Sequence, residues 1–201
     1  MKLFGFKGTR SNRVEWMLQE LGVDYELVKV DLQTGQHKTP DHVARHAHGL
    51  VPALEDGDVR MIESAASCLY LADKFADKGL APPVSSPARA RYYQLAFYAV
   101  STLDESVVPL FFHTVLYPPE KREQAVIDAK TPIWETAAQL LTRELGDSPY
   151  LLGKSFSAAD VVVGYDLALA ARSGLLAKHP KLAAYTERIT SRDAFKKAYA
   201  P

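Results

Sequence analysis

Two short motifs in the first third of the chain carry residues that suit a small peptide-like anion. The first is Leu50-Val-Pro-Ala-Leu54, in which Pro52 follows an apolar residue between turn-prone segments. Such a proline can hold a cis peptide, which turns nearby backbone groups outward to pair with an extended ligand. The second is Glu63-Ser64 at the start of a predicted helix, where open amides, the helix dipole and the Ser64 hydroxyl favour a carboxylate. Together the motifs predict a site for the ends of a short peptide.

Apolar periodicity around these motifs predicts a small domain that mixes strands and helices. Short alternating runs indicate strands, whereas an apolar stripe at helical spacing that ends at Gly22 indicates the first helix. The predicted strands are residues 3–6, 25–31, 53–54 and 59–62, and the later helices are residues 40–47 and 64–78. The order β-α-β, α, β-β, α therefore fits within residues 1–78.

A proline-rich segment separates this domain from the rest of the chain. Residues 79–87 contain Pro82, Pro83 and Pro87, which stop helices and stiffen a connector. Strand signals are missing beyond it, and residues typical of helices dominate 88–116 and 120–146. We therefore predict an α+β domain at 1–78, a linker at 79–87 and an all-α helical bundle at 88–201.

A capping box predicts a further helix in the second domain. Ser157 and Asp160 are three residues apart, so that each side chain can satisfy the backbone amide of the other residue. Apolar residues then recur at helical spacing from Val161 to Ala168. We expect this helix to be the buried centre of the bundle.

Composition argues against nucleic acid and membrane partners. The 201 residues include 24 Lys and Arg against 24 Asp and Glu, so no net field attracts polyanions. No apolar run approaches the roughly 20 residues of a membrane span, and the first residues do not resemble a signal peptide. We expect a cytoplasmic protein with no metal, whose single cysteine, Cys68, lies on an apolar stripe in the core.

Five motifs resemble those of the glutathione transferase family, in order and over essentially the whole chain. They are Arg13-Val-Glu-Trp-Met-Leu-Gln-Glu-Leu-Gly22, Gly35-Gln-His-Lys38, Gly49-Leu-Val-Pro-Ala-Leu-Glu-Asp-Gly57, Glu63-Ser-Ala-Ala66, and Leu152-Gly153 with Phe156-Ser-Ala-Ala-Asp-Val161. The second motif is most similar to the cytosolic theta-type and related bacterial branches. The resemblance implies a thioredoxin-like first domain, a homodimer, and reduced glutathione as co-substrate beside the cis-proline.

The parts of glutathione suit different residues of these motifs. Glu63 suits the ammonium of the γ-glutamyl group, and Ser64 with its helix N-terminus suits the carboxylate. The backbone at Val51 and Pro52 suits the cysteinyl amide as an antiparallel pair. His37 and Lys38 suit the glycine carboxylate. The alternatives are ordinary helix capping for Glu63 and Ser64, and a solvated loop for His37 and Lys38.

The loop that enters the first helix is where the family keeps its sulfur-activating residue. The theta-type serine would fall on Gly8 and the bacterial cysteine on Arg10, so neither arrangement is reproduced. The hydroxyls of Thr9 and Ser11 remain as donors, and Arg10 adds positive charge. Ser11 as the N-cap of the first helix is the alternative. Leu50 stands where theta-type members often carry lysine, which predicts weaker glutathione binding.

The start of the second domain is rich in aromatic residues. A hydrophobic pocket for an electrophile is predicted around Phe111, Phe112 and Tyr117, although aromatics at helical spacing also suit a core. His113 lies among them, and we assign it no chemical role because an activated thiolate needs no further base.

These observations predict a glutathione S-transferase that directs the glutathione thiolate at a hydrophobic electrophile. A glutathione-dependent disulfide reductase is one alternative, which would act through bound glutathione alone. A ligand-binding or interaction protein of the same fold is another, because Gly8 occupies a catalytic position.

Overall fold

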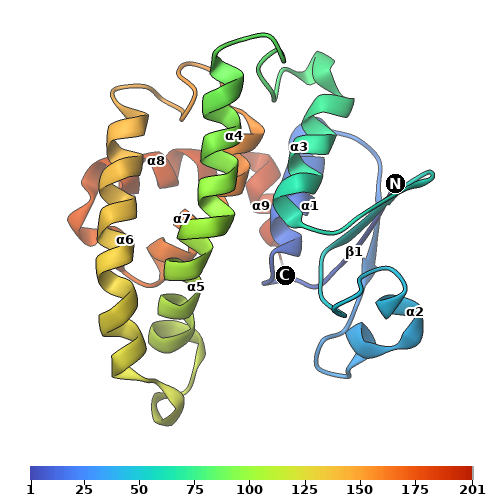
Figure 1. Cartoon of the computed structure of the whole chain (residues 1–201), viewed down its shortest axis with the longest axis horizontal. Coiled ribbons are helices and arrows are strands. Elements are labelled where there is room, and N and C mark those ends of the chain that lie inside the picture. Colours follow the sequence, from blue (N-terminus) through green and yellow to red (C-terminus); the bar gives the residue numbers. More distant parts are fainter. Residues whose placement is uncertain (201) are drawn as a thin grey trace. The chain divides into compact units, whose positions relative to one another are not determined.

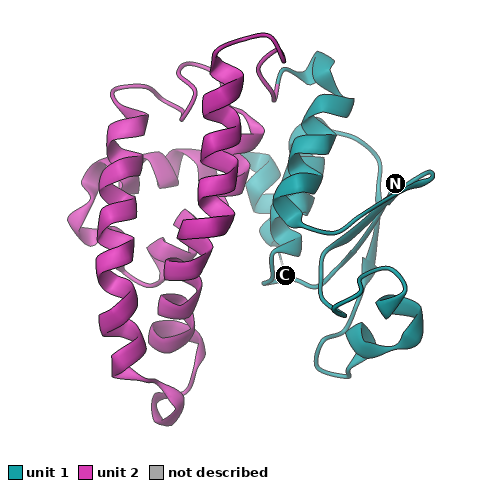
Figure 2. Cartoon of the chain, viewed as in Figure 1, with its two compact units in different colours: residues 1–79, 192–201 teal, residues 80–191 magenta. Residues whose placement is uncertain are grey.

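The computed structural model describes residues 1–200, which form two compact units (Figure 2). Unit 1 contains residues 1–79 together with 192–200, and unit 2 contains residues 80–191. The sequence predicts that residues 192–200 belong to the helical domain. In the structure they pack with unit 1, because their side chains contact the first helix of that unit.

Unit 1 is built on the predicted four-stranded sheet, with strand order β2-β1-β3-β4 (Figure 1). Strand β1 (Lys2–Gly5) pairs in parallel with β2 (Glu26–Lys29) and antiparallel with β3 (Ala53–Asp56). Strand β4 (Val59–Met61) closes the predicted hairpin with β3. The thioredoxin-like architecture expected from the sequence is confirmed, and no strand end differs from its predicted position by more than two residues.

Helices cover both faces of this sheet. Helix α1 (Ser11–Leu21) packs against β1, α3 (Ser64–Lys74) and α9 (Asp193–Tyr199). Helix α2 (Pro40–Val43) lies on the opposite face. There Phe4, Val30 and Ala53 form a buried cluster. Two 3₁₀ turns, η1 (Gln36–Lys38) and η2 (Ala76–Lys78), precede α2 and follow α3, so the long helix predicted over 64–78 is interrupted at Phe75.

Unit 2 consists of helices, as predicted. They are α4 (Ala88–Tyr98), the π-helical η3 (Ala99–Leu103), α5 (Asp104–Phe111), the π-helical η4 (Phe112–Leu116), the 3₁₀ turn η5 (Pro119–Lys121), α6 (Gln124–Leu145), α7 (Ala158–Arg172), the 3₁₀ turn η6 (Leu175–Lys178) and α8 (Pro180–Thr190). Helix α7 is almost wholly buried and contacts α4, α5 and α8. It is therefore the centre of the bundle that the apolar spacing predicts.

The capping box at the start of α7 is present, and Asp160 is fully buried there. Its carboxylate accepts from the Ser157 backbone N–H (2.9 Å), the Ser157 hydroxyl (2.9 Å), the Leu151 N–H (2.9 Å) and the Tyr185 hydroxyl (2.7 Å). Burial raises the pKa of Asp160, although these hydrogen bonds oppose the change. One carboxylate thus ties the helix start to the preceding loop and to α8.

One helical stretch of unit 2, Ala88–Leu116, is long and apolar enough to cross a membrane by length and composition alone. Half of its most apolar window is buried inside the structure, as in the core helix of a folded bundle. The sequence predicts a helical segment over these same residues, 88–116, but it contains no uninterrupted apolar run of the roughly 20 residues expected for a membrane span.

Candidate functional site

The peptide bond between Val51 and Pro52 is cis, as the motif predicts. Pro52 is buried and leads directly into β3, where Ala53 pairs with Phe4. Val51 is half-buried and packs on the cluster of Phe4, Val30 and Ala53, and Ile62 packs on the same cluster. The proline segment and the residue before Glu63 therefore share one patch of core, which brings the two predicted motifs together.

Helix α3 presents an open N-terminus at this place. The Ser67 N–H donates to the Glu63 carbonyl (2.9 Å) as the first bond of the helix, so the amides of residues 64–66 have no acceptor within α3. The Glu63 side chain is exposed and makes no capping hydrogen bond. Its φ of 71° is the only positive value at a non-glycine among residues 1–200. Backbone strain of this kind is concentrated at ligand sites.

A buried arginine stands behind the Ser64 hydroxyl. Arg13 of α1 is fully buried, and its Nη1 donates to Ser64 Oγ over 2.9 Å. Because Ser64 Oγ accepts this bond, its own hydroxyl hydrogen can be donated to an anion beside the helix N-terminus. Arg13 begins one of the five family motifs, but the sequence alone assigns it no role. The feature of the sequence that could have indicated its role is its position: Arg13 is a charged residue next to Val14 and one turn before Met17, within the apolar stripe of α1.

The hydroxyls of the loop before α1 are engaged with one another. Ser11 Oγ accepts from the Phe6 N–H (3.2 Å) and lies 2.9 Å from the Thr9 hydroxyl, which also donates to the Phe6 carbonyl (2.6 Å). The N-cap position of α1 is occupied by Arg10, so Ser11 is the first helical residue and not the cap. Thr9 Oγ1 instead accepts from the Ser11 N–H (3.2 Å).

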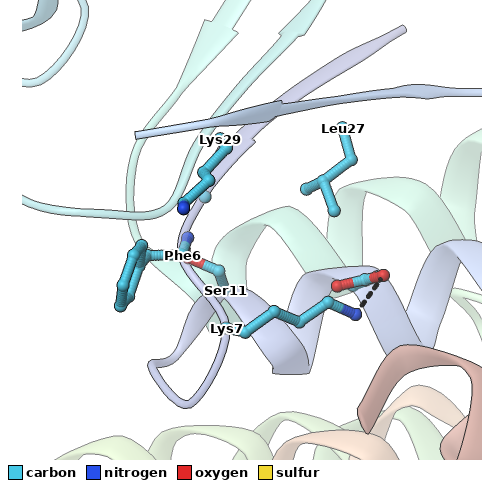
Figure 3. Close-up of a pocket in the computed structure, with 7 residues that line it drawn as sticks. Phe6, Lys7, Ser11, Leu27 and Lys29 are labelled. Carbon is cyan, nitrogen blue, oxygen red and sulfur yellow. Dashed lines mark hydrogen bonds and ion pairs between the residues drawn. The ribbon is translucent and has the colours of Figure 1, made fainter. Parts of the chain in front are cut away.

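Ser11 also faces a cavity between α1 and the β1–β2 edge of the sheet (Figure 3). The cavity has a volume of about 330 Å³ and is lined by Gly5, Phe6, Lys7, Ser11, Glu15, Leu27 and Lys29. A side chain at Gly5 would meet Ser11 Cβ at 2.8 Å, so Ser11 packs tightly on β1. With 2% of its surface exposed, Ser11 is more confined than the half-buried Thr9.

His37 and Lys38 lie against the loop that leads to Val51. Lys38 Nζ donates to the His48 carbonyl over 2.9 Å. Gly49 has a φ of 56°, and a Cβ there would lie 2.5 Å from the His37 carbonyl, so only glycine permits this approach. Both residues therefore contact the loop that leads to Val51, with His37 half-buried and Lys38 exposed.

The aromatic residues of the predicted pocket lie in unit 2. Phe111 is 6% exposed, and the Arg172 guanidinium lies over its ring at 4.6 Å, as in a packed core. Phe112 and Tyr117 are half-buried, with ring centroids 5.2 Å apart. His113 Nδ1 accepts from the Glu123 N–H (2.8 Å), which is a structural contact.

Two further groups bear on the chemistry. Cys68 is fully buried, as predicted, and burial raises the pKa of its thiol to about 12, so it is not a nucleophile near neutral pH. Within residues 1–200, no group of three or more His, Cys, Asp and Glu side chains is arranged to hold a metal ion.

Comparison with known proteins gives consistent matches along the chain. Residues 1–73 match the family model "Glutathione S-transferase, N-terminal domain", and residues 124–188 match "Glutathione S-transferase, C-terminal domain". The chain is 32% identical to "Glutathione S-transferase 3" of Zea mays over 209 residues, which covers 100% of this chain and 93% of that protein.

Solved structures agree with these matches. A sphingomonad glutathione S-transferase complexed with glutathione superimposes with a TM-score of 0.84 at 31% identity, covering 99% of this chain and 97% of that one. Glutathione transferase F7 from Populus trichocarpa superimposes with a TM-score of 0.89 at 28% identity, covering 98% and 96%.

Proposed function

We propose that this chain, which belongs to the glutathione S-transferase family, binds reduced glutathione in unit 1 and activates its sulfur for attack on a hydrophobic electrophile. One observation carries the proposal. The open amides of α3, the Ser64 hydroxyl and the buried cation of Arg13 converge beside the Val51–Pro52 segment. This arrangement suits a carboxylate at one end of an extended peptide.

The proposed binding mode assigns one part of glutathione to each group. The γ-glutamyl carboxylate lies at the α3 N-terminus with Ser64, and Glu63 faces the ammonium. The Val51 backbone before Pro52 pairs with the cysteinyl residue. His37 and Lys38 receive the glycine carboxylate, and their contacts with Gly49 and the His48 carbonyl support this part of the proposal.

The chemical step is nucleophilic attack by the glutathione thiolate. The sulfur donates an electron pair to the electrophilic carbon, a leaving group such as chloride departs with its bond pair, and the thiol proton is released to solvent. A free thiol titrates near pH 8.5, so lowering its pKa by about two units requires roughly 2.7 kcal/mol of thiolate stabilisation. One hydroxyl donor together with the positive field of Arg10 and the loop amides is of that order.

The second substrate, the assembly and the location are proposed on the family resemblance and on composition. We propose that a hydrophobic electrophile binds near Phe112 and Tyr117, whose rings contact each other and, through Phe112, the buried Phe111. A cytoplasmic homodimer is the expected form.

A non-catalytic binding protein is the second candidate, and one observation favours it. Gly8 has no side chain, and the hydroxyls of Thr9 and Ser11 already bond within the loop. Such a protein would retain glutathione without turning over electrophiles or mixed disulfides.

Turnover of a chloro-aromatic electrophile by Thr9→Ala and Ser11→Ala tests the assignment. We expect Thr9→Ala to lower kcat/KM about tenfold, because Thr9 is half-exposed and can turn its hydroxyl to the sulfur. Ser11→Ala should mainly lower the unfolding midpoint, since it leaves the Phe6 N–H without its acceptor.

Thr34→Ala is the matched control, because it removes an exposed threonine hydroxyl from the loop that follows β2. If neither Thr9→Ala nor Ser11→Ala loses more than about threefold, or roughly 0.7 kcal/mol, the loop hydroxyls do not activate the sulfur. Retention on immobilised glutathione without any turnover would support the binding protein, and turnover of mixed disulfides alone would support the reductase.

A further inference from the structure

The segment that leads to the proline, residues 47–51, has no helix or strand of its own. Leu50 is 53% exposed, so side-chain packing does not hold this residue. Its backbone carbonyl, however, lies 2.7 Å from Nε2 of His42. Because a carbonyl only accepts, the His42 ring carries its hydrogen on Nε2 and donates it to Leu50.

The His42 side chain is itself held in place, so its hydrogen bond can fix the conformation of residues 47–51. It is the buried residue of α2, with 3% of its surface exposed, and it lines a small cavity together with Phe4 of β1 and Arg45. One turn further on, Arg45 anchors the same side, with its guanidinium 4.5 Å from the centre of the Phe4 ring and its Nε 3.4 Å from Glu55 Oε1 of β3. The backbone of residues 45 and 46 continues the turn by donating to the His42 carbonyl. The imidazole therefore has little freedom to move relative to the sheet.

The hydrogen bond to Leu50 has a directional consequence for Val51. Among residues 1–200, the only cis bond is the one between Val51 and Pro52, so the Leu50–Val51 peptide is trans. In a planar trans peptide the C=O and the N–H point in opposite directions. With the Leu50 carbonyl directed inward at His42, the Val51 N–H is directed away from α2, toward the side where an extended peptide would pair.

From these contacts we infer that His42 is a positioning residue for glutathione, setting the orientation of the Val51 amide through the Leu50 carbonyl. This inference rests on the proposed function, because it assigns a role within the same glutathione site. His42 itself touches no substrate. It lowers the cost of ordering the Leu50–Val51 peptide when the ligand pairs with it.

The test compares two substitutions of His42 by steady-state kinetics and calorimetry. His42→Phe keeps a ring of similar size but has no N–H, whereas His42→Gln places an amide N–H near the Nε2 position. We expect His42→Phe to raise the KM and Kd for glutathione about three- to tenfold, with kcat and the KM for the electrophile changed less than twofold. His42→Gln should restore the glutathione KM to within about twofold of the parent.

Val43→Ala is the control, because Val43 is the next residue of α2 after His42 and its side chain is 37% exposed. It should bind glutathione as the parent does. The inference is overturned if His42→Phe leaves the glutathione KM unchanged, if it lowers kcat instead, or if Phe and Gln weaken binding equally while lowering the unfolding midpoint. A parent protein that shows no calorimetric binding of glutathione would instead refute the proposed function, before any variant is compared.

Discussion

At the scale of single residues, the buried Arg13 is the feature on which glutathione binding depends most. A guanidinium that is fully removed from water requires compensating partners, and one of them is the Ser64 hydroxyl at 2.9 Å. The cation thus reinforces the positive end of α3 from inside the protein, where solvent screens it little. The arginine and the serine act as one anion-binding unit.

Arg13→Met tests this unit, since methionine keeps the length of the side chain and removes its charge and donors. We expect the Kd for glutathione, measured by calorimetry, to rise about ten- to hundredfold, which is typical of losing a hydrogen bond that involves a charged group. Ser64→Ala should cause a similar loss. The double variant should bind only slightly worse than either single variant, because the two changes remove the same interaction.

Arg60→Met is a suitable control for these variants. Arg60 lies on β4 with 72% of its side chain exposed, so its charge should contribute little to binding in unit 1. An Arg13→Met protein with a lowered unfolding midpoint but an unchanged Kd would show that Arg13 serves packing alone.

At the scale of elements, the N-terminus of α7 depends on Asp160. Four donors from the preceding loop, the cap residue and α8 meet at this one carboxylate. An asparagine at this position would replace one acceptor oxygen by an NH₂ group, which is itself a donor and cannot accept from the donors that remain.

Asp160→Asn should therefore lower the free energy of unfolding by about 2–4 kcal/mol in denaturant titrations, whereas Ser157→Ala should cost about 1 kcal/mol. Asp147→Asn is the matched control, because this exposed carboxylate pairs only with Lys181 among the described residues, and the substitution should leave the midpoint unchanged. A loss for Asp160→Asn no larger than for Ser157→Ala would contradict the central role of the carboxylate.

The raised pKa of Asp160 adds a pH dependence to the same comparison. A raised pKa means that the folded state holds the proton more tightly than the unfolded chain does. The stabilisation that this proton uptake gives the folded state is therefore complete below about pH 4. It declines as the pH rises toward the raised pKa of Asp160. Asp160→Asn cannot titrate, so the difference in stability between parent and variant should shrink over that range.

At the scale of the whole molecule, the chain leaves unit 1 after residue 79 and returns to it at residue 192 (Figure 2). The returning helix α9 is held to α1 by polar and aromatic contacts. Arg192 donates to both carboxylate oxygens of Glu20 at 2.6 Å, Asn12 Nδ2 donates to the Ala198 carbonyl at 2.7 Å, and Phe195 meets Trp16 edge-on at 4.9 Å. Unit 1 is therefore completed by the last residues of the described chain.

A chain that ends at residue 191 should lose this support. We expect a lower thermal midpoint, and a rise in tryptophan exposure detectable by fluorescence, because removing α9 uncovers Trp16, which is fully buried in the complete chain. The double variant Lys196→Ala and Lys197→Ala, which changes only exposed residues of α9, should melt like the parent. A truncated chain with the same midpoint would mean that α9 does not stabilise unit 1.

Local sequence determined much of this protein. Period-two and period-3.6 patterns within single segments were sufficient for the strands, for α1 and for the buried α7, because they depend on which face of an element avoids water. The cis Val51–Pro52 bond and the box at Ser157 and Asp160 also followed from neighbouring residues, since proline chemistry and capping act over a few positions.

Only the tertiary structure decided the contacts between distant segments. Arg13 meets Ser64 across 51 positions, and α9 returns to α1 across more of the chain, so no local pattern could reveal either contact. The hydroxyls of Thr9 and Ser11 looked free in the sequence, but the loop uses them for its own backbone. Burial and the direction of hydrogen bonds belong to the assembled fold, because they depend on which neighbours exclude water from a group.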